Sequence, residues 1–68
     1  MSIAKVSEII SSSSKSFEDA VQEGIKRANK TLENVSGVWI KGEKVIVAKG
    51  KITEYRVTMR VSIILKDS

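Results

Sequence analysis

The strongest constraint on the fold is the alternation of apolar and polar side chains from Lys51 to Leu65. A period of two is the pattern of a β-strand that buries one face. On the predicted buried face are Tyr55, Val57, Met59, Val61, Ile63 and Leu65. On the opposite face are Glu54, Arg56, Thr58, Arg60 and Ser62. The C-terminal quarter of the chain is therefore predicted to be one long strand.

A second strand is predicted to begin between Asn34 and Gly37 and to run to Ala48, ahead of a compact hairpin turn at Lys49-Gly50. Glycine takes the positive φ that such turns need. The extended pattern is interrupted near Lys41-Gly42-Glu43, where the glycine indicates a bulge or bend. The two strands are expected to pair as a hairpin.

The first half of the chain predicts a strand at residues 3–10, a loop at the serine run Ser11–Ser14 and a helix over about residues 17–33. Ser16 is placed to cap that helix. The apolar stripe of the helix consists of Phe17, Ala20, Val21, Gly24, Ile25, Ala28 and Leu32. Gly24 costs helix stability, and close approach of another backbone would account for it. The result is an α+β fold, β-α-β-β, in a single domain spanning 1–68.

The predicted elements differ in length in a way that requires further copies of the chain. A strand of about 14 residues extends roughly 45 Å, whereas a helix of about 17 residues reaches only about 25 Å. One helix cannot cover even one face of such a sheet. We expect uncovered apolar side chains near Ile63, Ile64 and Leu65, which a second subunit would shelter. The face with Arg56, Thr58 and Arg60 is then free to line an interior or a ligand site.

Composition excludes several classes of protein. With no cysteine and no histidine among 68 residues, disulfides and the usual zinc sites are ruled out, and so is an imidazole general base. The chain is therefore expected not to be an enzyme. Twelve basic against eight acidic residues give a net charge of +4, which suits nucleic acid, phosphorylated ligands or neither. Without an apolar run of about 18 residues or a signal-peptide pattern at the start, a soluble cytoplasmic protein is the simplest interpretation.

Nearly the whole chain resembles the dodecin family. The resemblance is carried by Lys5-Val6-Ser7-Glu8-Ile9-Ile10, Ser13-x-x-Ser16-Phe17-Glu18-x-Ala20, Ala28-x-x-Thr31-Leu32-x-Asn34-Val35, Gly50-Lys51-Ile52 and Tyr55-Arg56-Val57-Thr58-Met59-Arg60-Val61-Ser62. It implies a three-stranded antiparallel sheet partly wrapped around one helix. Twelve such subunits would form a hollow shell with the sheets facing inward. Flavin-binding members hold riboflavin or its phosphates in pairs at subunit interfaces, for storage and not for turnover.

Two positions depart from the flavin-binding pattern that the resemblance implies. Where those members stack a tryptophan on the flavin, this chain has Gly37, and where a glutamine bonds the ring it has Arg56. Trp39, two residues beyond Gly37 on the same strand face, predicts a shifted site with Arg56 and Thr58 beside it. The alternative is that Trp39 packs at an interface and that Arg56 pairs with Glu54 or another carboxylate.

Two functions therefore remain open from the sequence. The first is a homododecameric carrier of riboflavin, FMN or a related phosphate-bearing cofactor, with Gly37, Trp39, Arg56 and Thr58 as cofactor-binding residues. The second is a structural or interaction assembly that does not bind flavin. Some dodecin-like proteins bind calcium, but Glu8, Asp19 and Glu54 lack the spacing of a calcium loop, and ion pairing is favoured over a metal site. With three aromatic residues, nucleic acid is not the expected partner.

Overall fold

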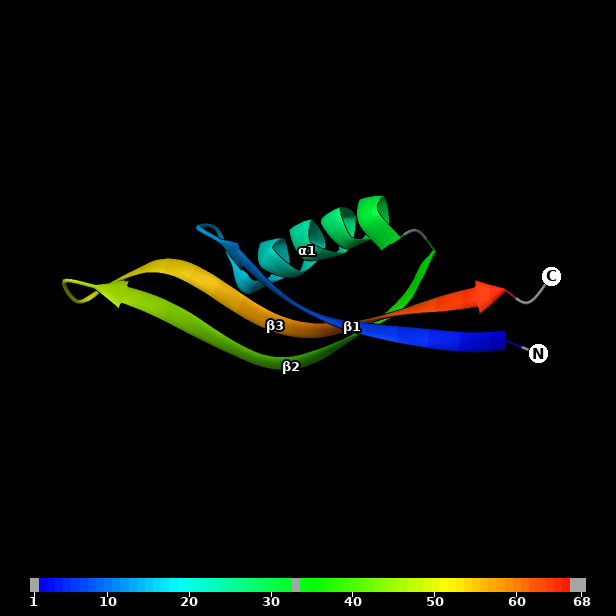
Figure 1. Ribbon diagram of the computed structural model, residues 1–68. Coiled ribbons are helices and arrows are strands. Elements are labelled where there is room, and N and C mark those ends of the chain that lie inside the picture. Colours follow the sequence, from blue (N-terminus) through cyan, green and yellow to red (C-terminus); the bar gives the residue numbers. More distant parts are fainter. Residues whose placement is uncertain (1, 33, 67–68) are drawn as a thin grey trace.

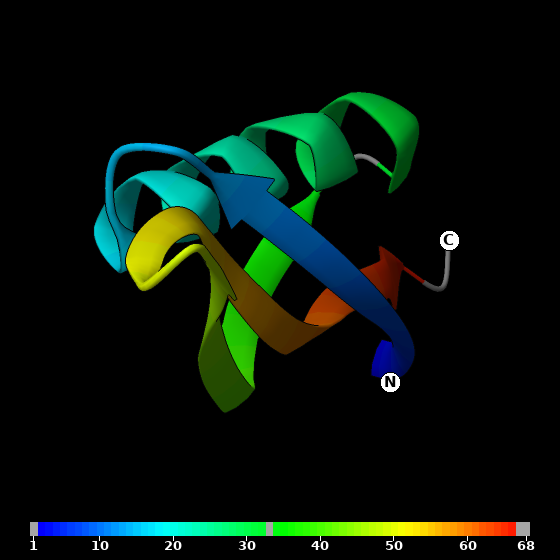
Figure 2. The same ribbon diagram turned by 90° about the vertical axis from the view of Figure 1, so that its left-hand side faces the viewer.

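The computed structural model describes residues 2–32 and 34–66 (Figure 1). These residues form strand β1 (Ser2–Ser13), helix α1 (Phe17–Leu32), strand β2 (Val35–Ala48) and strand β3 (Lys51–Lys66). The strands make one antiparallel sheet in the order β1-β3-β2, and α1 lies on one side of it (Figure 2). The predicted α+β class and β-α-β-β order are confirmed. The predicted helix end at residue 33 lies outside the described residues.

Helix α1 begins where the sequence places its cap. The hydroxyl of Ser16 accepts a hydrogen bond of 3.0 Å from the backbone N–H of Asp19, which satisfies one of the free amides of the first turn. Ser13 is the last residue of β1, and its hydroxyl donates a 2.6 Å hydrogen bond to the Asp19 carboxylate. Strand and helix are therefore joined through side chains as well as through the chain. α1, the helix of the described residues, is too short and too polar to span a membrane.

The predicted loop is wrong for Ser11, Ser12 and Ser13, because β1 continues through Ser13; Ser14 lies in the connection to α1. Ser11, Ser12 and Ser13 pair with β3 along its Tyr55–Val57 segment. The physical reason is lack of space: a Cβ atom built on Gly24 of α1 would lie 3.0 Å from the Cβ of Ser11. Small side chains are required where the helix crosses β1, and here serine meets that requirement.

The core lies between α1 and the middle of β3. Ala20, Val57 and Met59 are fully buried, and the rings of Phe17 and Tyr55 meet edge to face with centroids 5.2 Å apart. These positions confirm the predicted buried face of the strand and the predicted stripe of the helix. The close approach at Gly24 is made by the side chains of Met59 and Ser11, not by a backbone as predicted.

The β2–β3 hairpin turns at Lys49 and Gly50, which have φ angles of 53° and 75°. Positive φ at both central residues is the signature of a two-residue type I′ turn, so the predicted turn is confirmed. β2 is continuous from Val35 to Ala48, but its register with β3 shifts between Ile40 and Gly42. Of the predicted bulge or bend near Gly42, the structure thus shows the bulge.

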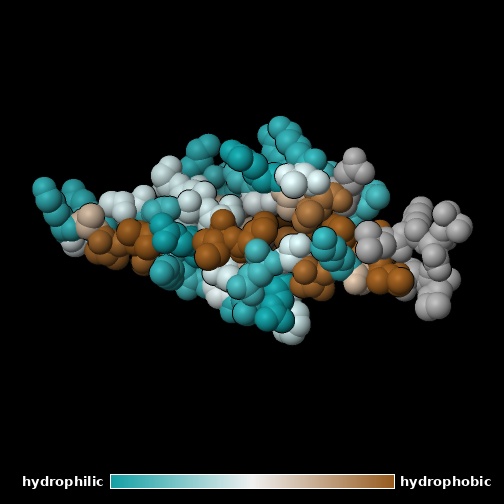
Figure 3. Space-filling model, in the orientation of Figure 1, coloured by the Kyte–Doolittle hydropathy of each residue, from teal (hydrophilic) through white to brown (hydrophobic). Residues whose placement is uncertain are grey.

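The sheet is much longer than the helix that covers it. The molecule measures 54 Å along its longest axis, whereas the 16 residues of α1 span about 24 Å. In Figure 1 the hairpin end and the opposite end of the sheet both extend beyond α1. Large apolar side chains that remain exposed are Ile3, Val6, Ile10, Trp39, Ile40, Val47, Ile52 and Ile64. Figure 3 shows apolar residues along much of this length.

The prediction of uncovered side chains near the end of β3 was wrong for one residue. Ile63 is only 6% exposed, whereas Ile64 is 38% exposed. Successive strand residues point to opposite faces, so Ile63 lies on the helix side and Ile64 on the other. The side chain of Leu65 lies outside the described part of the chain.

Candidate ligand site on the open face of the sheet

The four predicted site residues all lie on the sheet face that points away from α1, here called the open face. Antiparallel pairing arranges this face in cross-strand rows, each with one residue from β1, β3 and β2 in turn. The first row is Val6, Ser62 and Gly37; the second is Glu8, Arg60 and Trp39; the third is Ile10, Thr58 and Gly42; the fourth is Ser12, Arg56 and Lys44. Consecutive rows are about 7 Å apart. Each predicted residue occupies a different row.

The second row combines an exposed aromatic ring with a network of charges. The side chain of Trp39 is 70% exposed. One oxygen of Glu8 accepts bonds from Lys41 Nζ at 3.0 Å and from Arg60 Nε at 3.4 Å. The hydrogen bond and charge of Lys41, with a further contribution from Arg60, lower the pKa of Glu8. Glu8 thereby positions Arg60, and most of the five N–H donors of the Arg60 guanidinium stay available.

A cavity of about 330 Å³ opens between the first and second rows. Its lining consists of Val6, Gly37, Val38, Trp39, Arg60 and Ser62. The Ser62 hydroxyl donates to the Gly37 carbonyl at 3.3 Å, and a Cβ atom at Gly37 would lie 3.1 Å from that hydroxyl. Gly37 therefore contributes backbone and space, and Trp39 supplies the aromatic surface.

Arg56, in the fourth row, makes the ion pair that the alternative interpretation predicted. Its Nη2 lies 3.1 Å from Glu54 Oε2. A hydrogen bond from Ser12 and then the Arg56 guanidinium lower the pKa of Glu54. Along β3, Arg56 is four residues from the partner of Trp39, a separation of about 13 Å. Within one chain, the cation beside Trp39 is therefore Arg60.

Thr58 lies between these rows at the floor of a more open region. Its neighbours in the third row are Ile10 and Gly42. A Cβ atom built on Gly42 would meet no atom within 4 Å. The β2 end of the third row is thus low and uncrowded, whereas Ile10 is 66% exposed at its β1 end.

Sequence reasoning left several residues of this face out of the predicted site. Arg60 appears in the predicted basic stripe but not in the predicted site, and Glu8, Lys41, Lys44 and Ser62 were not assigned to it. Counting equal numbers of residues outward from the predicted Lys49-Gly50 turn would have placed Arg60 opposite Trp39. The two register shifts that lie between the turn and this pair cancel each other. Only the structure places Lys44 opposite Arg56, since that pair lies between the shifts.

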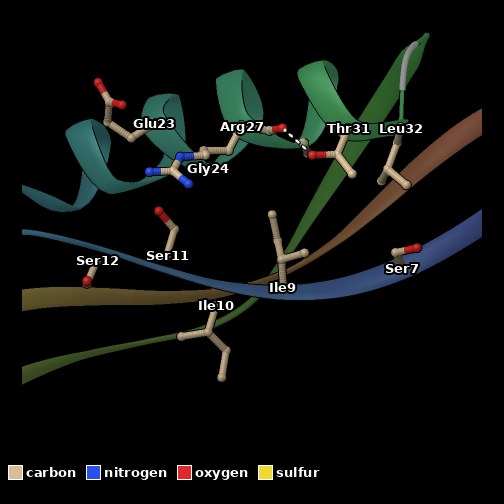
Figure 4. A pocket seen from close by; sticks show the side chains of 11 residues that line it. Ser7, Ile9, Ile10, Ser11, Ser12, Glu23, Gly24, Arg27, Thr31 and Leu32 are labelled. Atoms are coloured by element: carbon tan, nitrogen blue, oxygen red, sulfur yellow. Dashed lines mark hydrogen bonds between the residues drawn. The ribbon is translucent and has the colours of Figure 1, made fainter.

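A second cavity of about 580 Å³ lies on the other side of the sheet, between α1 and β1. Figure 4 shows Glu23 and Arg27 of the helix above Ser11 of the strand, with Ile9 pointing toward α1 and Ile10 away from it. The Thr31 hydroxyl donates to the backbone carbonyl of Arg27 at 3.3 Å. None of the four predicted site residues lines this groove.

Fold and open face together define a small strand-rich protein of the dodecin type, with an aromatic and basic sheet surface left uncovered by its one helix. A family model described as Dodecin matches residues 3–66. The chain belongs to the dodecin family.

Solved structures agree with this assignment. A dodecin from Streptomyces davaonensis superposes with a TM-score of 0.92 at 27% identity, covering 97% of each chain. A Thermus thermophilus dodecin variant superposes with a TM-score of 0.91 at 25% identity, and the match covers 98% of this chain and 100% of the variant. The calcium-chelating immunodominant antigen of Mycobacterium tuberculosis is described as a calcium dodecin. It superposes with a TM-score of 0.82 at 30% identity, and the match covers 97% of this chain and 94% of the antigen. A comparison with curated proteins finds no match.

Proposed function

We propose that this chain is a non-enzymatic ligand-binding and storage protein that works as a homododecameric shell, with riboflavin or FMN as its ligand. The observation that carries the proposal is the 70% exposure of Trp39 in the middle of the open face. An isolated tryptophan this exposed loses the hydrophobic gain of burial. A stacked ring of a ligand, sandwiched where two copies meet, would recover it.

The shell is supported by the unequal lengths of sheet and helix. Exposed apolar side chains occur on the open face, as at Val6 and Ile10, and near the hairpin end, as at Val47 and Ile52. Several large apolar side chains left exposed on so small a chain favour an interaction surface. Packing several copies with their open faces inward would cover the sheets and leave the polar side of each helix in water.

The ligand assignment is supported by the composition of the second row. Trp39 offers a planar π surface, and Arg60 offers N–H donors for ring carbonyls or a phosphate. Gly37 leaves room for a ring displaced by one row from the position that the family pattern uses. The site contains no pair of groups arranged for proton transfer, which fits binding without turnover.

The test combines mass and affinity. We expect an assembly of about 90 kDa, twelve times the 7.5 kDa chain, and quenching of flavin fluorescence on titration with riboflavin or FMN. Trp39→Ala should weaken flavin binding about tenfold or more, since stacking on an aromatic side chain contributes about 1–3 kcal/mol. Trp39→Phe keeps a ring and should retain most of the affinity. Unchanged flavin emission at micromolar protein would exclude flavin as the ligand.

A second candidate is an assembly that holds a divalent cation in place of flavin. It is favoured by the 30% identity to the calcium dodecin of Mycobacterium tuberculosis and by Gly37 and Arg56 at the family's flavin-contacting positions. Among residues 2–32 and 34–66, however, no three carboxylates gather at one place, and Glu8 and Glu54 are already paired with cations. Calorimetric titration of the assembly with calcium distinguishes the two candidates.

A further inference from the structure

The cavity of about 580 Å³ between α1 and β1, here called the α1–β1 groove, lies on the side of the sheet opposite the proposed flavin site. Figure 4 shows Ile9 of the strand pointing up into it and Leu32 of the helix pointing down. Both side chains line the groove and are only partly buried. Covering apolar surface of this kind is favourable, so the groove favours an occupant that brings apolar side chains of its own.

The strand that borders the groove is an edge of the sheet, because the strand order is β1-β3-β2. Over the part of the chain that the structure describes, β1 pairs with β3 alone. An edge strand presents a row of backbone N–H and C=O groups that an added strand can satisfy. The bordering edge therefore favours an extended segment as the occupant.

The hairpin end, defined here as residues 44–53, is an extended segment of the required kind. It reaches beyond α1 in Figure 1, and its Val47 and Ile52 side chains are 56% and 52% exposed. Its strand β2 is the other edge of the sheet, so it can pair with β1 of a second copy. Groove and hairpin end are different surfaces, and a head-to-tail contact between them builds a ring of copies when the rotation closes.

The charges of the two surfaces are complementary. The charged residues of the hairpin end are Lys44, Lys49 and Lys51, all of them cations. The first half of α1 carries three carboxylates and no cation, and one of them, Glu23, lines the groove. Arg27 borders the groove one turn further along the helix, so the lysines favour the Glu23 end. Among the described side chains, the ion pairs include neither Glu23 nor these lysines.

We propose that the α1–β1 groove holds the hairpin end of a second copy of this chain, with Val47 and Ile52 over its apolar floor and the turn lysines beside Glu23. The inference rests on the proposed function for the existence of an assembly, and it names the contact that builds it. Each copy then offers its groove to one neighbour and its hairpin end to another. The contact lies on the helix side of the sheet and leaves the open face to the ligand.

Charge reversal with rescue tests the contact, with the mass of the assembly followed on dilution. Glu23→Lys should raise the protein concentration at which the assembly dissociates by about tenfold or more, because like charges then meet across the contact. Lys49→Glu with Lys51→Glu should do the same. Combining these changes with Glu23→Lys should restore the assembly, whereas combining them with the control Glu18→Lys, outside the groove lining, should not. Absence of rescue, or equal rescue by the control, overturns the contact.

A disulfide between copies is the second measurement, since the chain has no cysteine of its own. Glu23→Cys with Lys51→Cys, oxidised in the assembly, should give linked chains on a denaturing gel, because a disulfide requires Cα atoms within about 7 Å. Glu18→Cys with Lys51→Cys is the control and should leave chains of 7.5 kDa.

The outcomes separate this contact from the proposed function. Linked chains support the contact even if flavin does not bind or the assembly has fewer than twelve copies, results that overturn the proposed function alone. Unlinked chains in an assembly of about 90 kDa overturn the contact and leave the shell to other surfaces. A wild type that stays at 7.5 kDa overturns both.

Discussion

The terminal carbon of Met59 occupies the place where a Cβ atom on Gly24 would lie. Met59 is fully buried at the centre of β3, and Gly24 faces it from the middle of α1. The Cβ of Ser11 closes the same space from β1. This contact fixes how closely the helix approaches the sheet.

Gly24→Ala should therefore destabilise the protein although alanine is the better helix former by about 1 kcal/mol. Overpacking in a closed core costs about 1–3 kcal/mol, and the Ser11 Cβ atom cannot rotate away as the end of Met59 can. Chemical denaturation midpoints measure the change. Glu23→Ala, at an exposed neighbouring position of α1, should stay within about 0.5 kcal/mol of the wild type. A more stable Gly24→Ala would contradict the packing argument.

Ser16→Ala should lower stability by about 0.5–2 kcal/mol, because the Asp19 amide loses its 3.0 Å acceptor at the start of α1. Ser14→Ala, in the same connection, is the matched control and should change stability little. Thermal unfolding of both variants is the measurement. Equal melting temperatures for the two variants would show that the cap contributes nothing to stability.

Stability should depend on pH through Glu8. Its pKa in the folded protein lies below the ordinary value because of the hydrogen bond and charge of Lys41 and the bond from Arg60. A depressed carboxylate pKa stabilises the fold at pH above the unfolded value of about 4.5, and this contribution is lost as pH falls through the folded pKa. The stability gap between wild type and Glu8→Gln should be present at pH 7 and shrink below about pH 4.5.

Denaturant midpoints at pH 7 and at pH 3.5 measure this gap. Glu43→Gln, which removes a carboxylate of β2 outside the Lys41–Glu8–Arg60 cluster, is the control for a general charge effect. A gap that grows as the solution is acidified would reverse the expected sign and refute the role given to Glu8.

Restoring the family's aromatic and amide pair should raise flavin affinity. The double variant Gly37→Trp with Arg56→Gln supplies a ring in the first row and a hydrogen-bonding amide in the fourth. A side chain at position 37 crowds the Ser62 hydroxyl at 3.1 Å, so Ser62→Gly in the same background should add to the gain. Riboflavin fluorescence quenching measures it, with Gly37→Ala and Arg56→Gln as the ringless control. No gain over that control would show that the open face does not accept a flavin at this row.

Much of the fold could be predicted because the patterns are local. The alternation from Tyr55 to Ile63 defined the buried face of β3, and Lys49-Gly50 defined the hairpin turn. The serine run was wrongly predicted as a loop, because serine is common in loops and also in strands that need small side chains beneath a helix. Only the packing of α1 over Ser11 distinguishes the two.

The candidate site was predicted less completely than the fold. Trp39 and Arg56 were recognised as residues of one face, and the structure confirms the ion pair of Arg56 with Glu54. The residue of β2 opposite Arg56 could not be predicted, because that pair lies between two shifts of register, at Ile40/Gly42 and at Ile46/Val47. A one-residue shift exchanges which side chains are neighbours across the sheet.

The amino-acid sequence by itself determined the order of elements, the buried face of β3 and the excess of strand over helix, since each follows from periodicity and length along the chain. The tertiary structure alone decided that Lys44 opposes Arg56 and that Lys41 bonds Glu8. Those contacts depend on the register between strands and on the bulge that alters it, and register is a property of pairing between distant segments rather than of any one segment.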